Sequence, residues 1–243
     1  MPNTPIVNKG MIYANTMNLV YLTATTMTLT AGQCRNSSNV NDITLSASVT
    51  INTATTGANG LDQGAMGNDT RYTVYAIGSS TGAADSAGII STDASSPLLP
   101  GDYDMYLRVG TVLTNGSAQI LPFFQSGNGL TRFMMYDTPI QELSNGTATT
   151  FTDVDFSSSV PDTATWLLLE GAQTPNSAAN TLFLRRNGSG ATNGSARIAG
   201  QVAAVEIVDQ VWVPCDSGAI VEYKVSNGSD SADVFLVGYM DAL

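Results

Sequence analysis

The stretch that indicates the fold class is Ile43-Thr44-Leu45-Ser46-Ala47-Ser48-Val49-Thr50-Ile51. Apolar and polar residues alternate strictly along it, and successive side chains of a β-strand point to opposite faces of a sheet. The pattern therefore predicts one half-buried antiparallel strand, whose buried face holds Ile43, Leu45, Ala47, Val49 and Ile51.

Similar runs, rich in β-branched and aromatic residues, occur along the rest of the chain, and each has the length of an ordinary strand. In the run 205–213 the apolar residues fall on both faces, which predicts a bend, a bulge or burial on both sides. We expect the other strands at 19–22, 26–30, 71–77, 105–113, 119–124, 166–170, 181–185, 220–225 and 234–239.

Helices have little support in the sequence. Long apolar stripes with a 3.6-residue period are missing, and Thr and Gly, which are poor helix formers, are abundant. At most a short turn is expected near residues 83–90. Many short strands separated by turn signals predict an all-β fold of antiparallel β-sandwich or jelly-roll-like domains, rather than βαβ units.

Asn-Gly pairs supply the turn signals. Both residues tolerate positive φ, which type I′ hairpin turns require. The pairs begin at Asn59, Asn115, Asn128, Asn145, Asn187, Asn193 and Asn227. We therefore expect tight hairpins along the whole chain.

The length of 243 residues fits two domains of ordinary size. The apolar pattern lapses between residues 137 and 150, so we place the boundary there and expect domains at 19–138 and 145–243. Residues 1–18 contain Pro2 and Pro5, which disfavour a regular ladder. They are expected to form an N-terminal arm that is either disordered or docked on another subunit as an added strand.

The charge balance excludes several partners. Nine basic and twenty acidic residues give a formal net charge of −11 and a pI near 4.1. A phosphate backbone would be repelled, so no nucleic-acid partner is expected. No window approaches the roughly 18 apolar residues of a membrane span, so no membrane insertion is expected. Residues 1–10 lack the apolar segment of a secretion signal, and we expect synthesis and folding in the cytoplasm.

Residue types that common active sites need are missing. The chain contains no histidine, which excludes Ser-His-Asp, Cys-His and histidine–metal arrangements within one chain. The phosphate-binding patterns GxxxxGK[ST] and GxGxxG are absent as well. Cys34 and Cys215 belong to no CxxC cluster and are interpreted as free thiols, with a disulfide as the alternative. We therefore expect no catalytic residue, no cofactor and no enzymatic activity.

Two pairs of carboxylates could nevertheless carry chemistry. Asp153 and Asp155 share one face of an extended strand, and Asp102 and Asp104 follow a Pro-Gly turn. Glycosidases need two acids roughly 5–10 Å apart, and carboxylate oxygens are ligands for Ca²⁺. Asp102 and Asp104 are thus candidate metal ligands, and Asp153 and Asp155 are candidate glycan contacts. The favoured alternative is that all four belong to turns and solvated strand edges.

Aromatic side chains present the same choice. Tyr103 and Tyr106 could form a platform for a sugar and are candidate glycan or receptor contacts. They lie in or beside strand-like runs, and aromatic side chains are enriched in cores and in subunit interfaces, where their burial contributes large free energies. Packing is therefore the favoured interpretation.

Five segments follow one another in the first half of the chain. They are Ala31-Gly32-Gln33-Cys34-Arg35-Asn36-Ser37-Ser38-Asn39-Val40-Asn41-Asp42-Ile43, Gly57-Ala58-Asn59-Gly60-Leu61-Asp62, Tyr72-Thr73-Val74-Tyr75-Ala76-Ile77-Gly78, Leu99-Pro100-Gly101-Asp102-Tyr103-Asp104 with Arg108-Val109-Gly110, and Phe124-Gln125-Ser126-Gly127-Asn128-Gly129. In this order they resemble a block of phage tail-fibre and appendage proteins and of virion proteins of large DNA viruses. The resemblance covers residues 17–137. The family pattern has Arg-Asp-Ser where this chain has Arg35-Asn36-Ser37. The resemblance implies a β-rich, trimeric virion surface component and assigns no catalytic residue. We therefore expect domain 19–138 to be the virion-type domain that oligomerises and attaches, and domain 145–243 to be an exposed C-terminal β-sandwich.

The expected function is that of a viral structural protein, from a bacteriophage, located on the virion surface as a capsid decoration, head fibre or tail appendage subunit. The expected partners are further copies of the chain in a homotrimer, other virion proteins of the capsid or tail, and a host surface glycan. A receptor- or polysaccharide-binding fibre module is the alternative. A depolymerase that uses Asp153 and Asp155 is less favoured, because the sequence shows no regular repeat of the kind that builds a long β-helix.

Overall fold

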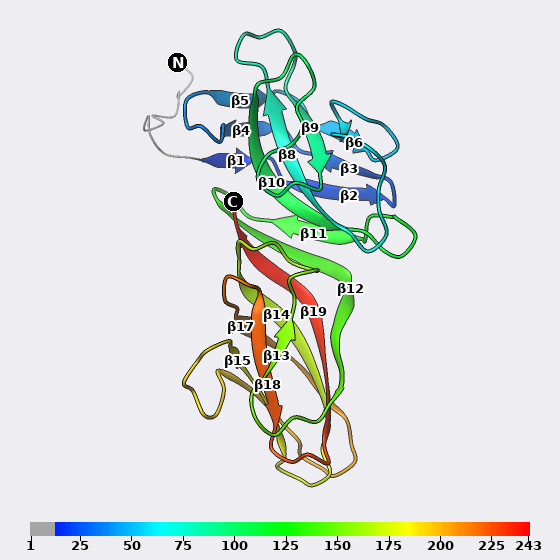
Figure 1. Cartoon of the computed structure of the whole chain (residues 1–243), viewed down its shortest axis with the longest axis vertical. Helices are drawn as coiled ribbons and strands as arrows, with labels where there is room; N and C mark the ends of the chain where they lie inside the picture. Colours follow the sequence, from blue (N-terminus) through cyan, green and yellow to red (C-terminus); the bar gives the residue numbers. More distant parts are fainter. Residues whose placement is uncertain (1–12) are drawn as a thin grey trace. The chain divides into compact units, whose positions relative to one another are not determined.

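A computed structural model of the chain describes residues 13–243. Every regular element in this range is a β-strand (Figure 1), which confirms the predicted all-β class. No helix in these residues is long and apolar enough to cross a membrane. Most of the predicted N-terminal arm, residues 1–12, lies outside the described range. The rest is part of a sheet, because β1 (Ala14–Thr16) pairs with β4 (Gly32–Arg35) of the same chain.

The chain divides into two compact units. Unit 1 comprises the residues up to Leu121 together with 125–132 and Leu243, and unit 2 comprises 122–124 and 133–242. The interval in which we expected the boundary, 137–150, is strand as far as Gly146, because β12 (Thr131–Gly146) runs through it. Its apolar pattern lapses because most side chains from Asp137 to Asn145 are half-buried or exposed.

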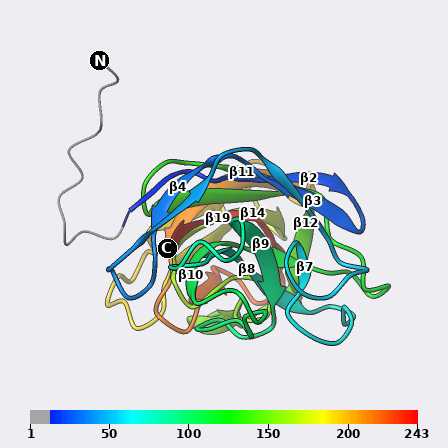
Figure 2. The same ribbon diagram turned by 90° about the horizontal axis from the view of Figure 1, so that it is seen from above.

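The strands of unit 1 form three groups. The first has the order β1-β4-β5, with β5 at Asp42–Leu45. The second has the order β10-β8-β9-β7, with bounds Met105–Leu113, Arg71–Gly78, Ala87–Ser91 and Gly60–Leu61. The third has the order β11-β2-β3-β6, with bounds Phe123–Ser126, Leu19–Thr23, Thr26–Leu29 and Val49–Asn52. Figure 2 shows β8, β9 and β10 beneath the layer that contains β2, β3 and β4.

Strand β8 is the centre of unit 1, since seven of its eight residues are buried. On one side, Tyr75 and Ile77 pack with Ala87 and Ile89 of β9. On the other side, β9 approaches β6 so closely that a Cβ added to Gly88 would collide with Ile51. The sheet β10-β8-β9-β7 is therefore covered on both faces. This explains why its strands are continuous apolar runs rather than alternating ones.

Residues 43–51 do not form one strand. They are divided between β5 and β6, which belong to different groups and pair with β4 and β3 respectively. Ile43, Leu45 and Ile51 are buried as predicted, whereas Ala47 is exposed in the connection and Val49 is only half-buried. Ser46, Ala47 and Ser48 continue the polar–apolar alternation, and as small residues they also fit an exposed bend. The alternation therefore could not show that the chain passes from one sheet to another at this point.

Unit 2 is a β-sandwich of two four-stranded layers. One layer has the order β13-β18-β15-β16, with bounds Thr152–Asp155, Ile220–Val225, Thr181–Arg186 and Ala196–Ala199. The other has the order β17-β14-β19-β12, where β17 is Ile207–Pro214, β14 is Ala164–Thr174 and β19 is Ser231–Ala242. A Cβ added to Gly171 of β14 would collide with Ile198 of the opposite layer, so the two inner faces pack closely at this position.

Two segments differ from the expected local structure. Residues 83–90 end in β9, all five residues of which are buried, where we expected at most a short turn. The segment 205–213 contains the edge strand β17, which pairs with β14 without a register shift, so neither a bulge nor burial on both sides occurs. Its second apolar face is exposed to solvent, with Val208 at 52% and Trp212 at 41%.

Six of the seven Asn-Gly pairs occur at or beside turns, whereas Asn145-Gly146 forms the end of strand β12, and the predicted type I′ geometry is wrong. In none of the seven pairs do both residues have positive φ. Asn115 and Asn227 instead accept, through their side chains, the N–H groups of Ser117 at 2.9 Å and Ser229 at 3.0 Å. The asparagine side chain thus replaces a backbone acceptor in an Asx turn, which the dipeptide alone does not distinguish from a tight hairpin.

Candidate functional site

The two candidate metal ligands belong to a loop contact. Asp104 accepts the N–H of Ser80 at 2.7 Å, and its other carboxylate oxygen accepts the Ser80 hydroxyl. These bonds lower the pKa of Asp104. Asp102 is exposed in the preceding turn. Among residues 13–243 no three His, Cys, Asp or Glu side chains come together in a way that could hold a metal ion. The two bonds to Ser80 join Asp104 to the loop that follows β8.

Tyr103 and Tyr106 pack against the buried cluster around Tyr75. The rings of Tyr106 and Tyr75 meet edge to face with their centroids 5.7 Å apart. The Tyr103 hydroxyl donates a hydrogen bond to the carbonyl oxygen of Asp85 at 2.9 Å. Both side chains are half-buried. Their contacts hold the segment around residue 103 against β8 and β9.

Asp153 and Asp155 lie on the exposed face of β13, as the alternation predicts, while Val154 between them is buried. Asp153 is directly opposite Glu222 of β18. Asp155 accepts the N–H of Ser157 at 2.8 Å and so caps the turn that ends the strand. The structure therefore brings both acids to one face of unit 2, and a further set of side chains on that face forms a pocket.

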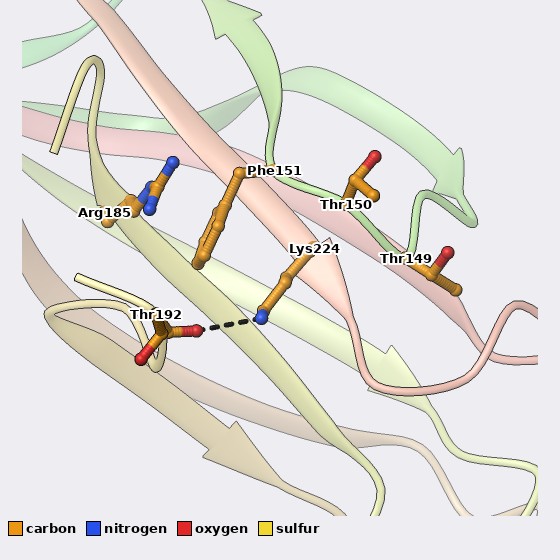
Figure 3. Close-up of a pocket in the computed structure, with 6 residues that line it drawn as sticks. All are labelled: Thr149, Thr150, Phe151, Arg185, Thr192 and Lys224. Atoms are coloured by element: carbon orange, nitrogen blue, oxygen red, sulfur yellow. Dashed lines mark hydrogen bonds between the residues drawn. The ribbon is translucent and has the colours of Figure 1, made fainter. Parts of the chain in front are cut away.

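This pocket is open, has a volume of about 360 Å³ and is lined by Thr149, Thr150, Phe151, Arg185, Thr192 and Lys224. Four pieces of chain build it (Figure 3). The segment before β13 supplies Phe151 and two threonines, β15 supplies Arg185, and β18 supplies Lys224. Thr192 comes from the loop between β15 and β16. Arg185 and Lys224 project outward because their neighbours Leu184 and Val225 occupy the buried face of the same strands.

Phe151 lies between the two cationic side chains in Figure 3. The guanidinium carbon of Arg185 is 3.6 Å from the ring centroid, and Lys224 Nζ is 4.6 Å from it. A cation is attracted to the face of an aromatic ring by the ring quadrupole. The phenylalanine therefore fixes the position of both cations and keeps them apart.

The two cations differ in how far their charge is neutralised. Arg185 Nε donates to Glu222 Oε2 at 2.5 Å, and both side chains of this ion pair are about seven-eighths buried. Lys224 Nζ donates to the carbonyl oxygen of Thr192 at 2.9 Å, which is a neutral acceptor. Lys224 therefore provides the uncompensated positive charge of the pocket.

The pairing of the strands places one further basic residue, Arg197, beside the pocket but outside its lining. Phe183 of β15 is directly opposite Lys224 of β18 on one side and Arg197 of β16 on the other. Its ring centroid is 5.0 Å from Lys224 Nζ. Sequence reasoning did not find this set. Alternation along 181–185 could have placed Phe183 and Arg185 on one exposed face, but only the strand register places Lys224 beside them.

The cysteines are both free and buried. Burial raises the pKa of Cys34 to about 12 and that of Cys215 to about 11. A thiol is a weak nucleophile until it loses its proton, so neither residue is suited to covalent chemistry near neutral pH.

The pocket on the exposed layer of unit 2 is thus the candidate functional site, and its chemistry is that of a binding site for an anion. Comparison with known proteins does not assign it: the chain matches no protein-family model and none of the curated proteins searched.

Proposed function

We propose that this chain is a structural protein of a virion surface, a capsid decoration, head fibre or tail appendage subunit of a bacteriophage that associates as a homotrimer. The observation that supports the proposal most directly concerns the segments that carry the family resemblance. All their residues except Phe124 belong to unit 1, so these segments lie almost entirely within one compact unit.

Residues of these segments have structural tasks in unit 1. Arg35 forms an ion pair with Asp42, with Nε 2.7 Å from the carboxylate. Asn36 accepts, through its side chain, the N–H groups of Val40 and Asn41 and so closes the loop between β4 and β5. Arg35 and Asn36 thus stabilise loops of unit 1, which is consistent with a structural role of this block.

An exposed aromatic cluster in unit 2 supports association with a partner. Trp166 and Trp212 lie on the neighbouring strands β14 and β17 and are 44% and 41% exposed. The Trp212 ring centroid is 5.6 Å from that of Phe133. Clustered exposed aromatic side chains are typical of protein–protein contact surfaces.

Light scattering of the purified protein tests the proposal, and we expect a mass three times the 25.3 kDa of the chain. The variant Trp212→Ser should shift the population towards monomer, and a labelled antibody should bind intact virions. A strictly monomeric protein that is not found on virions would refute both parts of the proposal.

A second candidate function is recognition of a host surface glycan by unit 2. The observation that favours it is the pocket around Lys224, which combines an uncompensated charge with threonine hydroxyls and aromatic rings. Binding of the purified chain to host cells, and loss of that binding after enzymatic removal of the surface polysaccharide, would be the expected result. Equal binding to treated and untreated cells would exclude it.

A further inference from the structure

The basic residues of unit 2 are concentrated in one layer. Arg185, Arg186, Arg197 and Lys224 are its four basic residues, and all lie on β15, β16 or β18. The chain as a whole carries a formal charge of −11. The same layer also carries Asp153, Asp155 and Glu222. A basic side chain without an ion-pair partner attracts an anion locally while the acidic remainder of the molecule repels it, which favours a small anionic group over an extended polyanion.

The arrangement of charges in and beside the pocket favours a ligand group with one negative charge over a group with two. Glu222 neutralises Arg185, so Lys224 is left with one positive charge. Asp153, directly opposite Glu222 on β13, adds a negative charge beside the pocket. A carboxylate balances Lys224, whereas the second charge of a phosphate monoester would face the two acids.

The hydrogen-bonding groups of the pocket suit a sugar. A lysine ammonium group has three N–H donors, and only the bond to the Thr192 carbonyl uses one of them. Thr149, Thr150 and Thr192 line the same space, and each threonine hydroxyl can both donate and accept. Sugar hydroxyls have the same dual character, so three threonines that line one pocket together with a lysine suit a polyhydroxylated ring with one carboxylate.

The pocket is held in place before any ligand arrives. Phe151 contacts both cations, and Arg185 also donates to the carbonyl oxygen of Ala191 at 2.9 Å, next to Thr192 in the same loop. Arg185 and Lys224 thus hold two adjacent residues of this loop, Ala191 and Thr192. A preorganised site loses less conformational entropy on binding than a flexible one.

We propose that this pocket binds a carboxylate-bearing sugar unit of a surface polysaccharide, with the carboxylate at Lys224 Nζ and the sugar hydroxyls at Thr149, Thr150 and Thr192. The proposal rests on glycan recognition as the function of unit 2 and specifies its ligand class and its site. It is independent of how the chain is attached to a virion.

Calorimetric titration of the full chain with a trisaccharide that carries one galacturonate between two neutral sugars tests the proposal. The methyl ester of the same trisaccharide is the control ligand, because it lacks only the charge. We expect the ester to bind at least tenfold more weakly, and binding of the acid to weaken as salt screens the charge. Equal affinity for acid and ester would overturn the proposed role of Lys224.

Variants separate the pocket from a general charge effect. Lys224→Met retains much of the side-chain volume and should weaken binding of the trisaccharide at least tenfold, and Lys224→Arg should restore part of it. Arg197→Gln removes the same charge from the same layer outside the pocket and should change the affinity less than twofold. Thr150→Val, which retains every charge, should weaken binding several-fold and provides a second test if Lys224→Met fails to fold.

The possible outcomes distinguish glycan recognition by unit 2 from the location of the binding site in this pocket. If the chain binds the trisaccharide but Lys224→Met and Thr150→Val bind it equally well, glycan recognition stands and this pocket is not its site. If the chain binds neither the trisaccharide nor host polysaccharide, both fail. A short polyglutamate peptide that binds as tightly as the trisaccharide would show that the pocket recognises acidic peptides, which also overturns the proposal.

Discussion

The guanidinium of Arg185 lies on the ring of Phe151, with its central carbon 3.6 Å from the ring centroid. Phe151 precedes β13 and Arg185 is in β15, so this contact extends over β18, which lies between these strands. Lys224 of β18 lies on the same ring at 4.6 Å. One half-buried phenylalanine therefore connects three strands of the exposed layer.

Replacing Phe151 by alanine should lower the free energy of unfolding by about 2 kcal/mol, because two cation–π contacts of about 0.5–1 kcal/mol each and part of the apolar burial are lost. Phe151→Leu keeps the apolar contact but not the quadrupole and should cost about 1 kcal/mol. Urea denaturation measures both values. An unchanged stability of the alanine variant would show that the stacking makes no net contribution.

The ion pair between Arg185 and Glu222 yields a second prediction. Glu222→Gln leaves a largely buried guanidinium without its counter-ion, which should cost about 2 kcal/mol, somewhat less than for a fully buried pair. Asp153→Asn is the matched control, because Asp153 is exposed and directly opposite Glu222. It should change the stability by less than about 0.5 kcal/mol. Similar losses for both variants would mean that the ion pair has no special role.

A third prediction concerns Gly238, where β19 passes β12. A Cβ at this position would collide with the backbone carbonyl of Met134, and a backbone cannot move aside as a flexible side chain can. Gly238→Ala should therefore destabilise the protein by about 1–3 kcal/mol. Gly101→Ala, where nothing lies within 4 Å of the added carbon, should be neutral. Thermal unfolding of the two variants compares them directly, and equal melting temperatures would contradict the close packing.

The all-β class could be predicted because period-two alternation and turn residues are local signals. Leu182, Leu184, Val221 and Val225 are all buried on the faces that their alternation indicates. Changes of sheet could not be predicted in the same way. The segment 43–51 alternates without interruption, yet it turns at Ser46–Ser48 from one sheet into another, because small residues fit an exposed bend as readily as a strand.

The candidate site was less accessible to sequence reasoning than the fold. Asp102, Asp104, Tyr103 and Tyr106 are close in sequence, and the structure assigns them loop and packing contacts. The pocket instead combines residues from 149 to 224, which meet only because β13, β18 and β15 are neighbours. Strand register is determined by the whole sandwich, so no local pattern contains it.

The two buried thiols should be inert in the native protein. Because burial raises the pKa of Cys34 to about 12 and that of Cys215 to about 11, little thiolate exists near neutral pH. We expect a thiol-reactive disulfide reagent to label neither cysteine in buffer and both in concentrated urea. Rapid labelling of one thiol under native conditions would indicate local opening around that residue.

The final prediction concerns Glu142, which is half-buried in β12 and accepts a hydrogen bond from the Ser159 hydroxyl. Burial raises the pKa of Glu142 above its ordinary 4.5; the Ser159 bond acts against this rise, and the nearby charge of Asp155 adds to it. A raised pKa means that the folded state binds the proton more tightly than the unfolded state does. The resulting stabilisation is complete below the unfolded pKa and is lost as the pH rises through the folded pKa.

Glu142→Gln removes this titration and retains a side-chain oxygen that can accept from Ser159. Relative to wild type, the variant should therefore become more stable as the pH rises from about 4 to about 7. Urea denaturation at both pH values measures the difference, with Glu206→Gln as an exposed control that should show no such trend. If the glutamine variant instead loses stability at the higher pH, the ionised carboxylate is the form that the fold stabilises, and the sign of the coupling is reversed.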